Sequence, residues 1–354
     1  MIKLLTSLPE TSRLETYGVL KQLVGAHRYL AELKGVTATI PNPEILINTL
    51  SLQEAKDSSG IENIFTTQDD LFQADIFFDR SRNPAAKEVH RYAAALKSGF
   101  EQMRGDRLIT VNRIVDYHKT LMNNEAGIRK LPGTVIKNSA TGEIVFTPPQ
   151  NPDEIQLLLT DLERFVNDDT ECAVDPLIAM AIVHHQFESI HPFYDGNGRA
   201  GRILNSLYLV ARELLDQPVL YLSAYIIDTK ADYYRLLQST RETDDWEPWL
   251  LYMIRGVEET SRATTGLIES IRNLMNNYEE RIKKDLPKIY SHELLNNLFR
   301  HPYTKIEAVQ DDLGVSRLTA SKYLAALSEK GFVEKHRFGK YNYYINQPLV
   351  RIFS

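Results

Sequence analysis

Hydrophobic residues recur at helical spacing through most of the chain. Between residues 10 and 37 they predict one helix, with Gly35 as its stop. The apolar positions of this segment are Leu14, Tyr17, Leu20, Leu23, Val24 and Leu30. The pattern resumes after Pro43 and continues in the stretches AAKEVHRYAAALKSGFEQM, TVNRIVDYHKTLMNN, ADYYRLLQST and WEPWLLYMIRGVEE. It predicts a mainly α fold.

Capping residues predict where two of the helices begin. Asp175 is a good N-cap, and Pro176 suits the first helical position that follows it. Ser58 is expected to cap a short helix around 61–64, with Glu62 in its first turns.

The interval from 127 to 150 has the pattern of a β-hairpin. Two short β-rich runs, 134–136 and 143–146, flank the turn-rich sequence KNSATG and are closed by Pro148 and Pro149. A lone hairpin is marginally stable, so it must lean on the helical part of the protein. Taken by itself, it is most simply a surface excursion.

Composition describes an ordinary globular protein. The chain has 354 residues, of which 43% are hydrophobic and 25% charged. Cys172 is the single cysteine, so an internal disulfide and a four-thiolate zinc site are excluded. The N-terminal apolar run is too short for a secretory signal, and no apolar run could span a bilayer. We therefore expect a cytoplasmic protein in a reducing compartment.

Charge and proline set the C-terminal part apart. A long polar-faced helix from Arg262 is expected to end at about Asp285, because Pro287 disfavours helical geometry just before it. Residues 291–354 carry nine Lys or Arg against six Asp or Glu, or +3, so with a net charge of −6 the remainder is −9. This segment is expected to be a separate module with its own kind of partner.

The most informative stretch is HHQFESIHPFYDGNGRAGR, residues 184–202. His184, Glu188 and His191 have the spacing of ligands on one helical face, which raises a metal site as one interpretation. Pro192 opposes it, because the residue before proline is pushed out of the α region and His191 then lies on a loop. His184 and His185 are better explained as packed or capping side chains.

A phosphate-binding loop explains the same stretch better. Its glycines permit close approach of the backbone, and a helix is expected to begin at its far end, where N–H groups and the helix dipole favour an anion. Asn197 offers an amide donor. Arg199 and Arg202 are about one helical turn apart, so both are expected to reach one polyphosphate.

The sequence HPFYDGNGRAGR resembles the signature of Fic proteins, His-x-Phe-x-(Asp/Glu)-Gly-Asn-Gly-Arg-x-x-Arg, and matches every defined position. The resemblance covers about residues 50–260 and implies a helical Fic fold that transfers AMP from ATP to a protein hydroxyl. It implies that His191 is the general base, that Asp195 binds Mg²⁺ and that Phe193 is a buried anchor. Tyr194 occupies a variable position and receives no role. The implied anion hole consists of Gly196, Asn197, Gly198, Arg199 and Arg202.

Other residues also resemble functional positions of the family. Gly198 stands where the kinase-like Doc branch has lysine, which favours nucleotidyl over phosphoryl transfer. Tyr233 and Tyr234 resemble a pair near the adenosine, although taken alone the pair is more simply core packing. The hairpin resembles the flap that covers the nucleotide and aligns an extended target segment. Its implied contact residues are Thr134, Val135, Ile136 and Lys137.

The segment SSGIEN resembles the family's inhibitory pattern, (Ser/Thr)-x-x-x-Glu-(Gly/Asn), with Ser58 and Glu62 as its defining residues. The resemblance implies that Glu62 pairs with Arg202 and so disturbs the posture of ATP. Two alternatives to AMP transfer stay open. Glu62 could instead serve removal of AMP from a modified target, or the chain could be a transcription regulator that senses nucleotide.

The C-terminal segment has the pattern of a winged helix. Ile306, Val309 and Leu313 mark one helix, Gly314 a turn, SRLTASKYLAALSEKG a second helix, and FVEKHRFGKYNYYIN a two-stranded wing turning at Gly339. This resembles the DNA-binding helix-turn-helix class. Its candidate recognition residues are Arg317, Thr319, Ser321 and Lys322. A surplus of +3 is modest for DNA binding, so DNA and protein partners both stay open.

These observations predict a four-part organisation. Residues 1–100 form an N-terminal helical region with the inhibitory motif, 101–260 the catalytic core, 261–290 a connecting helix and 291–354 the winged helix. The expected partner is a target protein with a Ser, Thr or Tyr hydroxyl. Self-modification and a homodimer stay open.

Overall fold

The computed structural model describes residues 2–5, 10–76, 83–137, 141–168, 174–338 and 341–353. Within these residues the chain is mainly helical with few strands, as predicted. Part of the predicted hairpin turn, Cys172 and Gly339 lie outside the described residues. None of the described helices combines the length and the hydrophobicity needed to cross a membrane.

Helix α8, Pro176–Ile190, is the centre of the fold. The side chain of Asp175 accepts the N–H of Leu177 at 2.8 Å, which confirms the predicted N-cap. Every residue from 177 to 190 is buried, because α7 (Pro152–Asn167), α9 (Asn197–Ala211) and α12 (Glu247–Asp285) pack around it. A helix buried on all sides is a rigid base for the loop that follows it.

The N-terminal segment forms two helices where one was predicted, α1 (Thr11–Leu14) and α2 (Tyr17–Thr37). Thr16 separates them because its hydroxyl accepts the N–H of Val19 at 3.2 Å and caps a new helix. The predicted stop at Gly35 is wrong. The helix runs through this glycine to Thr37, and Gly35 is not among the residues with positive φ that would end a helix.

The helix that follows Pro41 is longer than predicted. Helix α3 runs over Pro43–Ile61, so Ser58 lies in its last turns and does not cap a new helix. Glu62 is the residue that ends α3, and no helix forms over 61–64. Ser58 is itself a helical residue of α3, and its hydroxyl accepts a hydrogen bond from Arg202 in place of a backbone N–H of a following helix.

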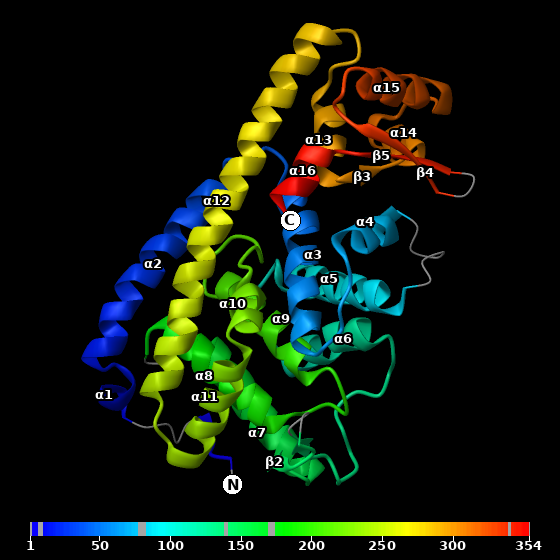
Figure 1. The fold of residues 1–354 in the computed structure, drawn as a ribbon. Coiled ribbons are helices and arrows are strands. Elements are labelled where there is room, and N and C mark those ends of the chain that lie inside the picture. Colours follow the sequence, from blue (N-terminus) through cyan, green and yellow to red (C-terminus); the bar gives the residue numbers. More distant parts are fainter. Residues whose placement is uncertain are drawn as a thin grey trace.

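Three further helices complete the region before the hairpin. They are α4 (Gln68–Ile76), α5 (Pro84–Met103) and α6 (Val111–Met122). Helix α5 packs against α3, α6 and α9, so the N-terminal helices form one body with the helix that follows the glycine-rich loop (Figure 1).

The predicted hairpin is present with shorter strands, β1 (Ile136–Lys137) and β2 (Ile144–Phe146). They pair antiparallel, with Ile136 opposite Phe146 and Lys137 opposite Ile144, and the register shifts between these pairs. The hairpin leans on helix α11 (Lys230–Thr243), where Gln238 donates a hydrogen bond to the carbonyl of Val145 at 3.2 Å.

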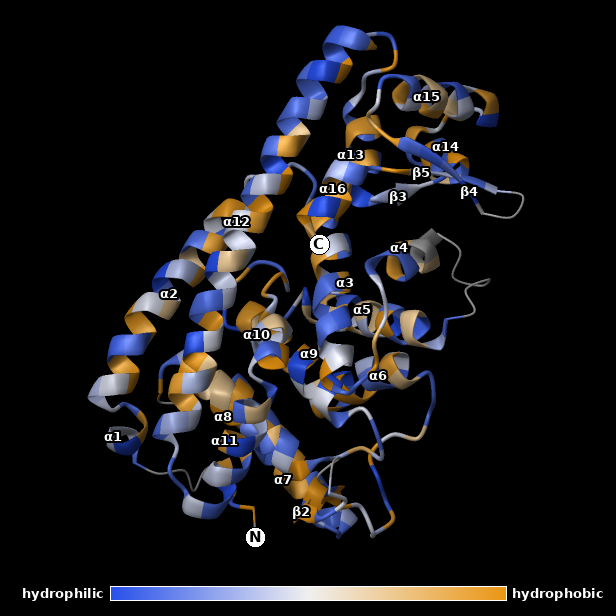
Figure 2. Cartoon of the chain, viewed as in Figure 1, coloured by the Kyte–Doolittle hydropathy of each residue, from blue (hydrophilic) through white to orange (hydrophobic). Residues whose placement is uncertain are grey.

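One helix, α12 (Glu247–Asp285), replaces the two helical segments predicted after Trp246. No proline or glycine cap interrupts it, and its end at Asp285 agrees with the predicted effect of Pro287. Helix α2 lies beside its first half, whereas its second half runs up to the C-terminal part of the chain (Figure 1). Hydrophobic and hydrophilic residues alternate along both helices (Figure 2). The short helix α10 (Leu222–Asp228) packs against α3 and α12.

The C-terminal segment folds around a three-stranded antiparallel sheet of order β3-β5-β4. Its predicted helices and wing strands are all found, and Gly314 ends the first helix in the left-handed conformation, with φ 63°. The elements are α13 (His292–Arg300), β3 (Tyr303–Thr304), α14 (Ile306–Leu313), α15 (Arg317–Glu329), β4 (Glu334–Phe338), β5 (Tyr341–Ile345) and α16 (Gln347–Ile352). Tyr278 of α12 donates a hydrogen bond to the carbonyl of Phe332 at 2.8 Å and thereby ties this segment to the long helix.

Candidate active site

His191 ends helix α8 in the left-handed conformation, with φ 50° and ψ 58°. Its N–H still bonds to the carbonyl of Phe187 at 2.9 Å, so the predicted position just past the helix end is confirmed. A left-handed non-glycine residue costs roughly 1–2 kcal/mol, so neighbouring contacts must hold it. Arg129 supplies them: its Nε donates to the carbonyl of His191 at 2.8 Å, and its backbone N–H donates to Pro192 at 2.9 Å.

The surroundings of His191 keep its imidazole neutral. Burial, and then the positive charges of Arg129 and Arg241, lower the pKa of His191 to about 4. At pH 7 a group with such a pKa is unprotonated and can accept a proton. A fixed and neutral imidazole at the end of a buried helix is suited to act as a general base.

The other histidines of this stretch are packed within the core. His184 Nε2 lies 2.8 Å from the Tyr233 hydroxyl, and His185 Nε2 lies 3.2 Å from the carbonyl of Leu237. Burial lowers the pKa of both to about 3. Across the described part of the chain, no three His, Cys, Asp or Glu side chains gather as metal ligands would.

The loop after His191 is closed by internal contacts. Phe193 is buried, as predicted, and its ring stacks on His118 with 3.5 Å between centroids. The side chain of Asn197 accepts the N–H of Phe193 and donates to its carbonyl, both at 2.8 Å. The Asn197 side chain thus closes the loop with its carbonyl oxygen and one of its two amide N–H groups, and its predicted contact with a phosphate stays a prediction.

Helix α9 begins inside the glycine-rich loop, at Asn197, and so earlier than predicted. Gly196 precedes it with φ 76°, a conformation that favours glycine. Asp195 accepts the Gly196 N–H at 2.6 Å, and its side chain is 77% exposed. Arg199 pairs with Glu88 of α5 and lies 3.9 Å from Asp195, so its guanidinium is already engaged on this side of the loop.

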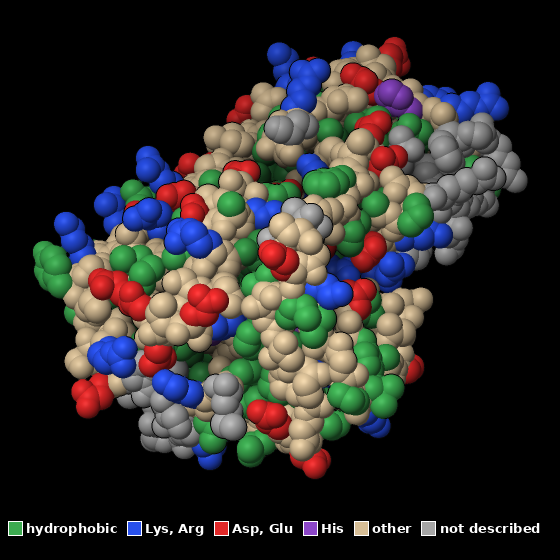
Figure 3. Space-filling view, turned by 60° about the horizontal axis from the view of Figure 1, so that its bottom comes forward, with side chains coloured by type: hydrophobic (Ala, Val, Ile, Leu, Met, Phe, Trp, Pro, Cys, Tyr) green, Lys and Arg blue, Asp and Glu red, His purple; other side chains and the backbone are tan. Residues whose placement is uncertain are grey.

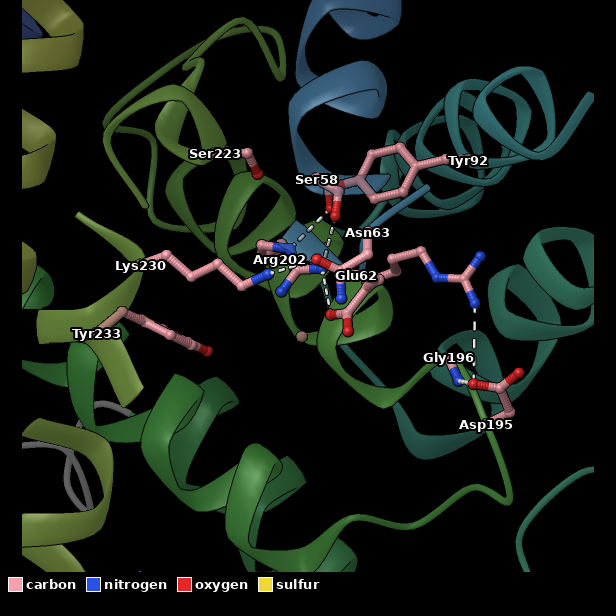
Figure 4. A network of polar contacts seen from close by, with 12 residues as sticks. Ser58, Glu62, Asn63, Tyr92, Asp195, Gly196, Arg202, Ser223, Lys230 and Tyr233 are labelled. Carbon is pink, nitrogen blue, oxygen red and sulfur yellow. Dashed lines mark hydrogen bonds and ion pairs between the residues drawn. The ribbon is translucent and has the colours of Figure 1, made fainter. Parts of the chain in front are cut away.

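Arg202 turns toward the end of α3 and binds both predicted inhibitory residues (Figure 4). Its Nε donates to the Ser58 hydroxyl at 2.7 Å, and its Nη2 donates to the Ser58 carbonyl at 2.9 Å and to Glu62 Oε1 at 2.8 Å. Arg202 is 2% exposed, whereas the Glu62 side chain is 34% exposed. Burial favours protonation of Glu62, but the charge and hydrogen bond of Arg202 outweigh it and hold the pKa of Glu62 below its usual value.

Gly198 makes room for this ion pair. A Cβ at this position would collide with Glu62 Oε1 and lie 3.0 Å from Arg202 Nη1. The residue after Glu62 is also fixed, because Lys230 donates to the side chain of Asn63 at 3.1 Å. The lack of a side chain at Gly198 therefore allows Glu62 to approach Arg202, and it also leaves the start of α9 open.

The structure separates the two tyrosines that were expected to lie near the adenosine. Tyr233 is 1% exposed and packs against Trp249 with 5.8 Å between ring centroids. Tyr234 is 44% exposed. Tyr233 is therefore a core residue, and stacking on a base is open to Tyr234 alone.

Three residues important for this geometry were missed by the sequence analysis. Arg129 fixes the backbone of His191, His118 Nε2 donates to the Asp195 carbonyl at 2.9 Å, and Glu88 engages Arg199. Tyr194, to which no role was given, accepts the backbone N–H of Lys130 at 2.9 Å. No local pattern marks them, since their partners are distant in sequence.

Three parts of the chain match sequence models of known protein families. Residues 20–101 match the sequence model of the Fic/DOC family N-terminal region, and residues 108–209 match that of the Fic/DOC family itself. The second match contains the hairpin, His191 and Arg202. The chain carries Fic-family domains. Residues 274–349 match a third model, described as the C-terminal domain of protein adenylyltransferase SoFic-like proteins.

Curated relatives match mainly around the Fic domain. Protein adenylyltransferase fic-1 of Caenorhabditis briggsae is 28% identical over 187 residues, which is 51% of this chain and 34% of that protein. The fic-1 protein of Caenorhabditis elegans is 26% identical over 179 residues, 49% of this chain and 32% of that protein. The chain thus spans about a third of the length of the curated relatives it matches.

Solved structures show the same fold. A Fic family protein from Desulfovibrio desulfuricans superposes with a TM-score of 0.59 at 20% identity, over 93% of this chain and 96% of that one. Fic-1 from C. elegans gives a TM-score of 0.54 at 20% identity, over 70% and 72% of the two chains. At this identity the likeness concerns the fold.

Proposed function

We propose that the chain transfers AMP from ATP to a hydroxyl side chain of a target protein. The observation that carries the proposal is the neutral His191, held by Arg129 directly before the glycine-rich start of α9. The curated relatives of the Fic domain are named protein adenylyltransferases, which supports the same activity and ATP as the substrate. A target Ser, Thr or Tyr is the expected acceptor, and the chain itself is one candidate.

The proposed reaction forms one bond and breaks one. The target hydroxyl oxygen attacks the α-phosphorus of ATP, and His191 takes the hydroxyl proton. The bond from the α-phosphorus to the oxygen that bridges to the β-phosphate breaks, and pyrophosphate leaves with the electron pair. Positioning and charge stabilisation are the main tasks of the protein in such a transfer. We propose that the backbone N–H groups of Gly198 and Arg199 at the start of α9 and the guanidinium of Arg202 serve them, whereas the N–H of Gly196 is bound by Asp195 Oδ1 at 2.6 Å.

Asp195 fits a magnesium ion that is shared with the nucleotide. Mg²⁺ is usually held by one or two carboxylates together with substrate phosphates, and it neutralises charge on the phosphate oxygens. Asp195 offers one carboxylate that is 77% exposed at the start of α9. It is a hard oxygen donor of the kind Mg²⁺ prefers, and we assign it this role.

We further propose that Ser58 and Glu62 inhibit the transfer. Arg202 should hold the γ-phosphate, but its Nη2 is occupied by Glu62 and its Nε by Ser58. ATP must then bind without this contact, and its α-phosphate is not presented to the attacking hydroxyl. Inhibition is thus a competition between a carboxylate and a phosphate for one buried guanidinium.

The target is proposed to bind along β1 as an extended segment. The carbonyl of Val145 in β2 is bound by Gln238 Nε2 at 3.2 Å, so we place the added strand on the side of β1. Residues Thr134 to Lys137 are expected to offer backbone groups there, except for the Thr134 carbonyl, which already accepts a hydrogen bond from Gln150 Nε2 at 2.9 Å. Such pairing brings a hydroxyl toward His191 with little sequence preference of its own.

Replacing Val135 with proline is expected to lower target modification at least about tenfold, because proline removes a backbone donor from this edge. ATP binding should persist, since the substitution leaves α9 untouched. The measurement compares initial rates of AMP incorporation with the affinity for ATP. A folded Val135→Pro variant with unchanged modification would mean that the hairpin is not the docking edge.

Removal of AMP from a modified target is the second candidate function. The Glu62 carboxylate binds Arg202 through Oε1 and is still one-third exposed, so it could orient a water molecule beside the phosphate site. A single experiment separates the two functions: the protein is incubated with Mg²⁺ and either ATP plus unmodified target or AMP-modified target alone. Mass gain by the equivalent of AMP supports transfer. AMP release that depends on Glu62, without any transfer, supports removal and contradicts the main proposal.

The C-terminal segment is proposed to be a winged-helix module that follows the connecting helix. The order of α14, Gly314, α15 and the β4-β5 hairpin supports this, as does the separate family match. We retain the four-part division predicted from the sequence. It consists of an N-terminal helical region (1–100), a catalytic core (101–260), a connecting helix (261–290) and the winged helix (291–354). Figure 3 shows one face of the whole chain, on which acidic and basic side chains are interspersed. The alternative partners of this module are DNA, a protein and a second copy of the chain. DNA is the partner that a nucleotide-sensing transcription regulator would require.

A further inference from the structure

Helix α11 holds the hairpin through two side chains on one face. Gln238 Nε2 donates to the carbonyl of Val145 in β2 at 3.2 Å, and its other contact is Glu242 Oε1 at 2.8 Å. One helical turn further, Arg241 lies over the ring of Phe146, with Cζ 4.4 Å from the ring centroid. Two successive residues of β2 are thus gripped, one by its backbone and the next by its aromatic ring.

Arg241 connects this grip to the helix that carries His191. Its Nε donates to the hydroxyl of Ser189 at 2.9 Å, two residues before His191, and its Nη1 donates to Gln238 Oε1 at 3.4 Å. Burial lowers the pKa of Arg241 to about 10, so the guanidinium keeps its charge at pH 7. A planar cation can stack on a ring and donate hydrogen bonds at its edge at the same time, which lysine cannot do equally.

The same arginine lines a cavity of about 550 Å³ together with the end of the hairpin. The cavity lies between the end of β2 and helices α8 and α11, and Phe146, Pro148, Gln186, Ser189, Arg241 and Trp246 are among its lining residues. The carbonyls that follow β2 have partners of their own, because Arg129 Nη2 binds the carbonyl of Pro149 and Gln150 Nε2 binds that of Pro148. Among the contacts of β2 itself, those of Gln238 and Arg241 link it to α11 and, through Ser189, to α8.

We propose that Gln238 and Arg241 are positioning residues that set the hairpin at a fixed distance from His191 for docking of the target strand. Both lie outside the segments that match the Fic-family models, which end at residue 209 and resume at 274. The proposal rests on the proposed function for its effect on AMP transfer. Its structural part, the fixing of β2, holds whether or not the chain transfers AMP.

The expected effect is specific to the target. A target strand that pairs with a displaced hairpin presents its hydroxyl out of line with His191, and a misplacement of about 1 Å can cost roughly a hundredfold in rate. ATP is held by α9 and Arg202, which neither residue touches. Loss of the grip should therefore raise the KM for the acceptor and lower kcat, whereas the KM for ATP changes little.

Arg241→Met tests the proposal, because methionine keeps an unbranched apolar stem like that of arginine and removes its charge and hydrogen bonds. Arg241→Lys should restore part of the function, and Gln238→Leu should loosen β2 without altering any charge. Arg235→Met is the matched control, since Arg235 lies on the same helix, is 64% exposed and pairs with Asp232 of that helix. Hydrogen exchange of the amides of residues 144–146 is measured in all variants, together with binding of ATP and thermal unfolding.

We expect exchange at residues 144–146 to rise at least about tenfold in Arg241→Met and Gln238→Leu, less in Arg241→Lys and not in Arg235→Met. Where the parent protein incorporates α-labelled AMP into an acceptor extract, the first two variants should lose at least about tenfold in rate, with the KM for ATP within twofold. Unchanged exchange in Arg241→Met and Gln238→Leu would overturn the proposal. A loss of ATP binding as large as the loss of AMP transfer would also overturn it. A parent protein without AMP transfer, but with the expected exchange pattern, contradicts the proposed function and leaves the grip on β2 supported.

Discussion

Replacing Glu62 with glycine is expected to raise the rate of AMP transfer by about 10- to 150-fold. The contact between Glu62 and Arg202 is a charge-assisted hydrogen bond of 2.8 Å to a guanidinium that is 2% exposed. Such bonds contribute about 1.5–3 kcal/mol, and each 1.4 kcal/mol corresponds to a factor of ten. Once the carboxylate is removed, Arg202 is free to bind the γ-phosphate. The measurement is the initial rate of AMP incorporation at saturating Mg²⁺.

The fold should survive this substitution, because Arg202 keeps both of its hydrogen bonds to Ser58. Glu44→Gln is a suitable control: Glu44 lies at the other end of α3 and pairs with Arg300 at 2.8 Å, far along the helix from Arg202. This control should transfer AMP at the rate of the wild type. Equal rates in the wild type and in Glu62→Gly would contradict the inhibitory role.

Replacing His191 is expected to lower AMP transfer by about 10²- to 10⁴-fold, which is the usual contribution of a positioned general base. Two variants, His191→Asn and His191→Ala, together separate the loss of the base from the effect of backbone strain. Asparagine tolerates the left-handed conformation of this residue better than alanine does, so His191→Asn should preserve the loop while removing the base. Both variants should bind ATP as the parent protein does. Wild-type transfer rates in a folded His191→Asn protein would exclude His191 as the base.

Local signals in the sequence account for much of the site. Asp175 and Pro176 mark the start of α8, Pro192 marks its end, and together they place His191 on a loop before the glycine-rich helix start. The hairpin also follows from local β-rich runs and turn residues. These predictions succeeded because each depends on contacts between residues close in sequence.

Contacts between distant residues explain the predictions that failed. Ser58 looks like an N-cap, yet its hydroxyl binds Arg202, which lies 144 residues away, and α3 continues past it. Tyr233 looks like half of an aromatic pair at a nucleotide, but its hydroxyl is bound to His184 inside the core. The side chain of Asn197 closes the loop on Phe193, only four residues away, and its predicted role as an amide donor to a phosphate stays a prediction.

The residues missed entirely share one physical cause. Arg129 and Glu88 act on the site through contacts with residues distant in sequence, and neither belongs to a motif or a periodic pattern. An arginine in a loop before a hairpin is normally read as a solvated charge. Its burial at 1% exposure becomes apparent only when the fold brings it under the His191 loop.

The most direct test of the account compares ATP labelled at the α-phosphate with ATP labelled at the γ-phosphate, using the Glu62→Gly protein and Glu62→Gly combined with His191→Asn. We predict that protein acquires label from the α position and none from the γ position, and that the second substitution removes this incorporation. Label from the γ position alone would show phosphoryl transfer and contradict the account, as would incorporation from the α position that is unaffected by loss of His191.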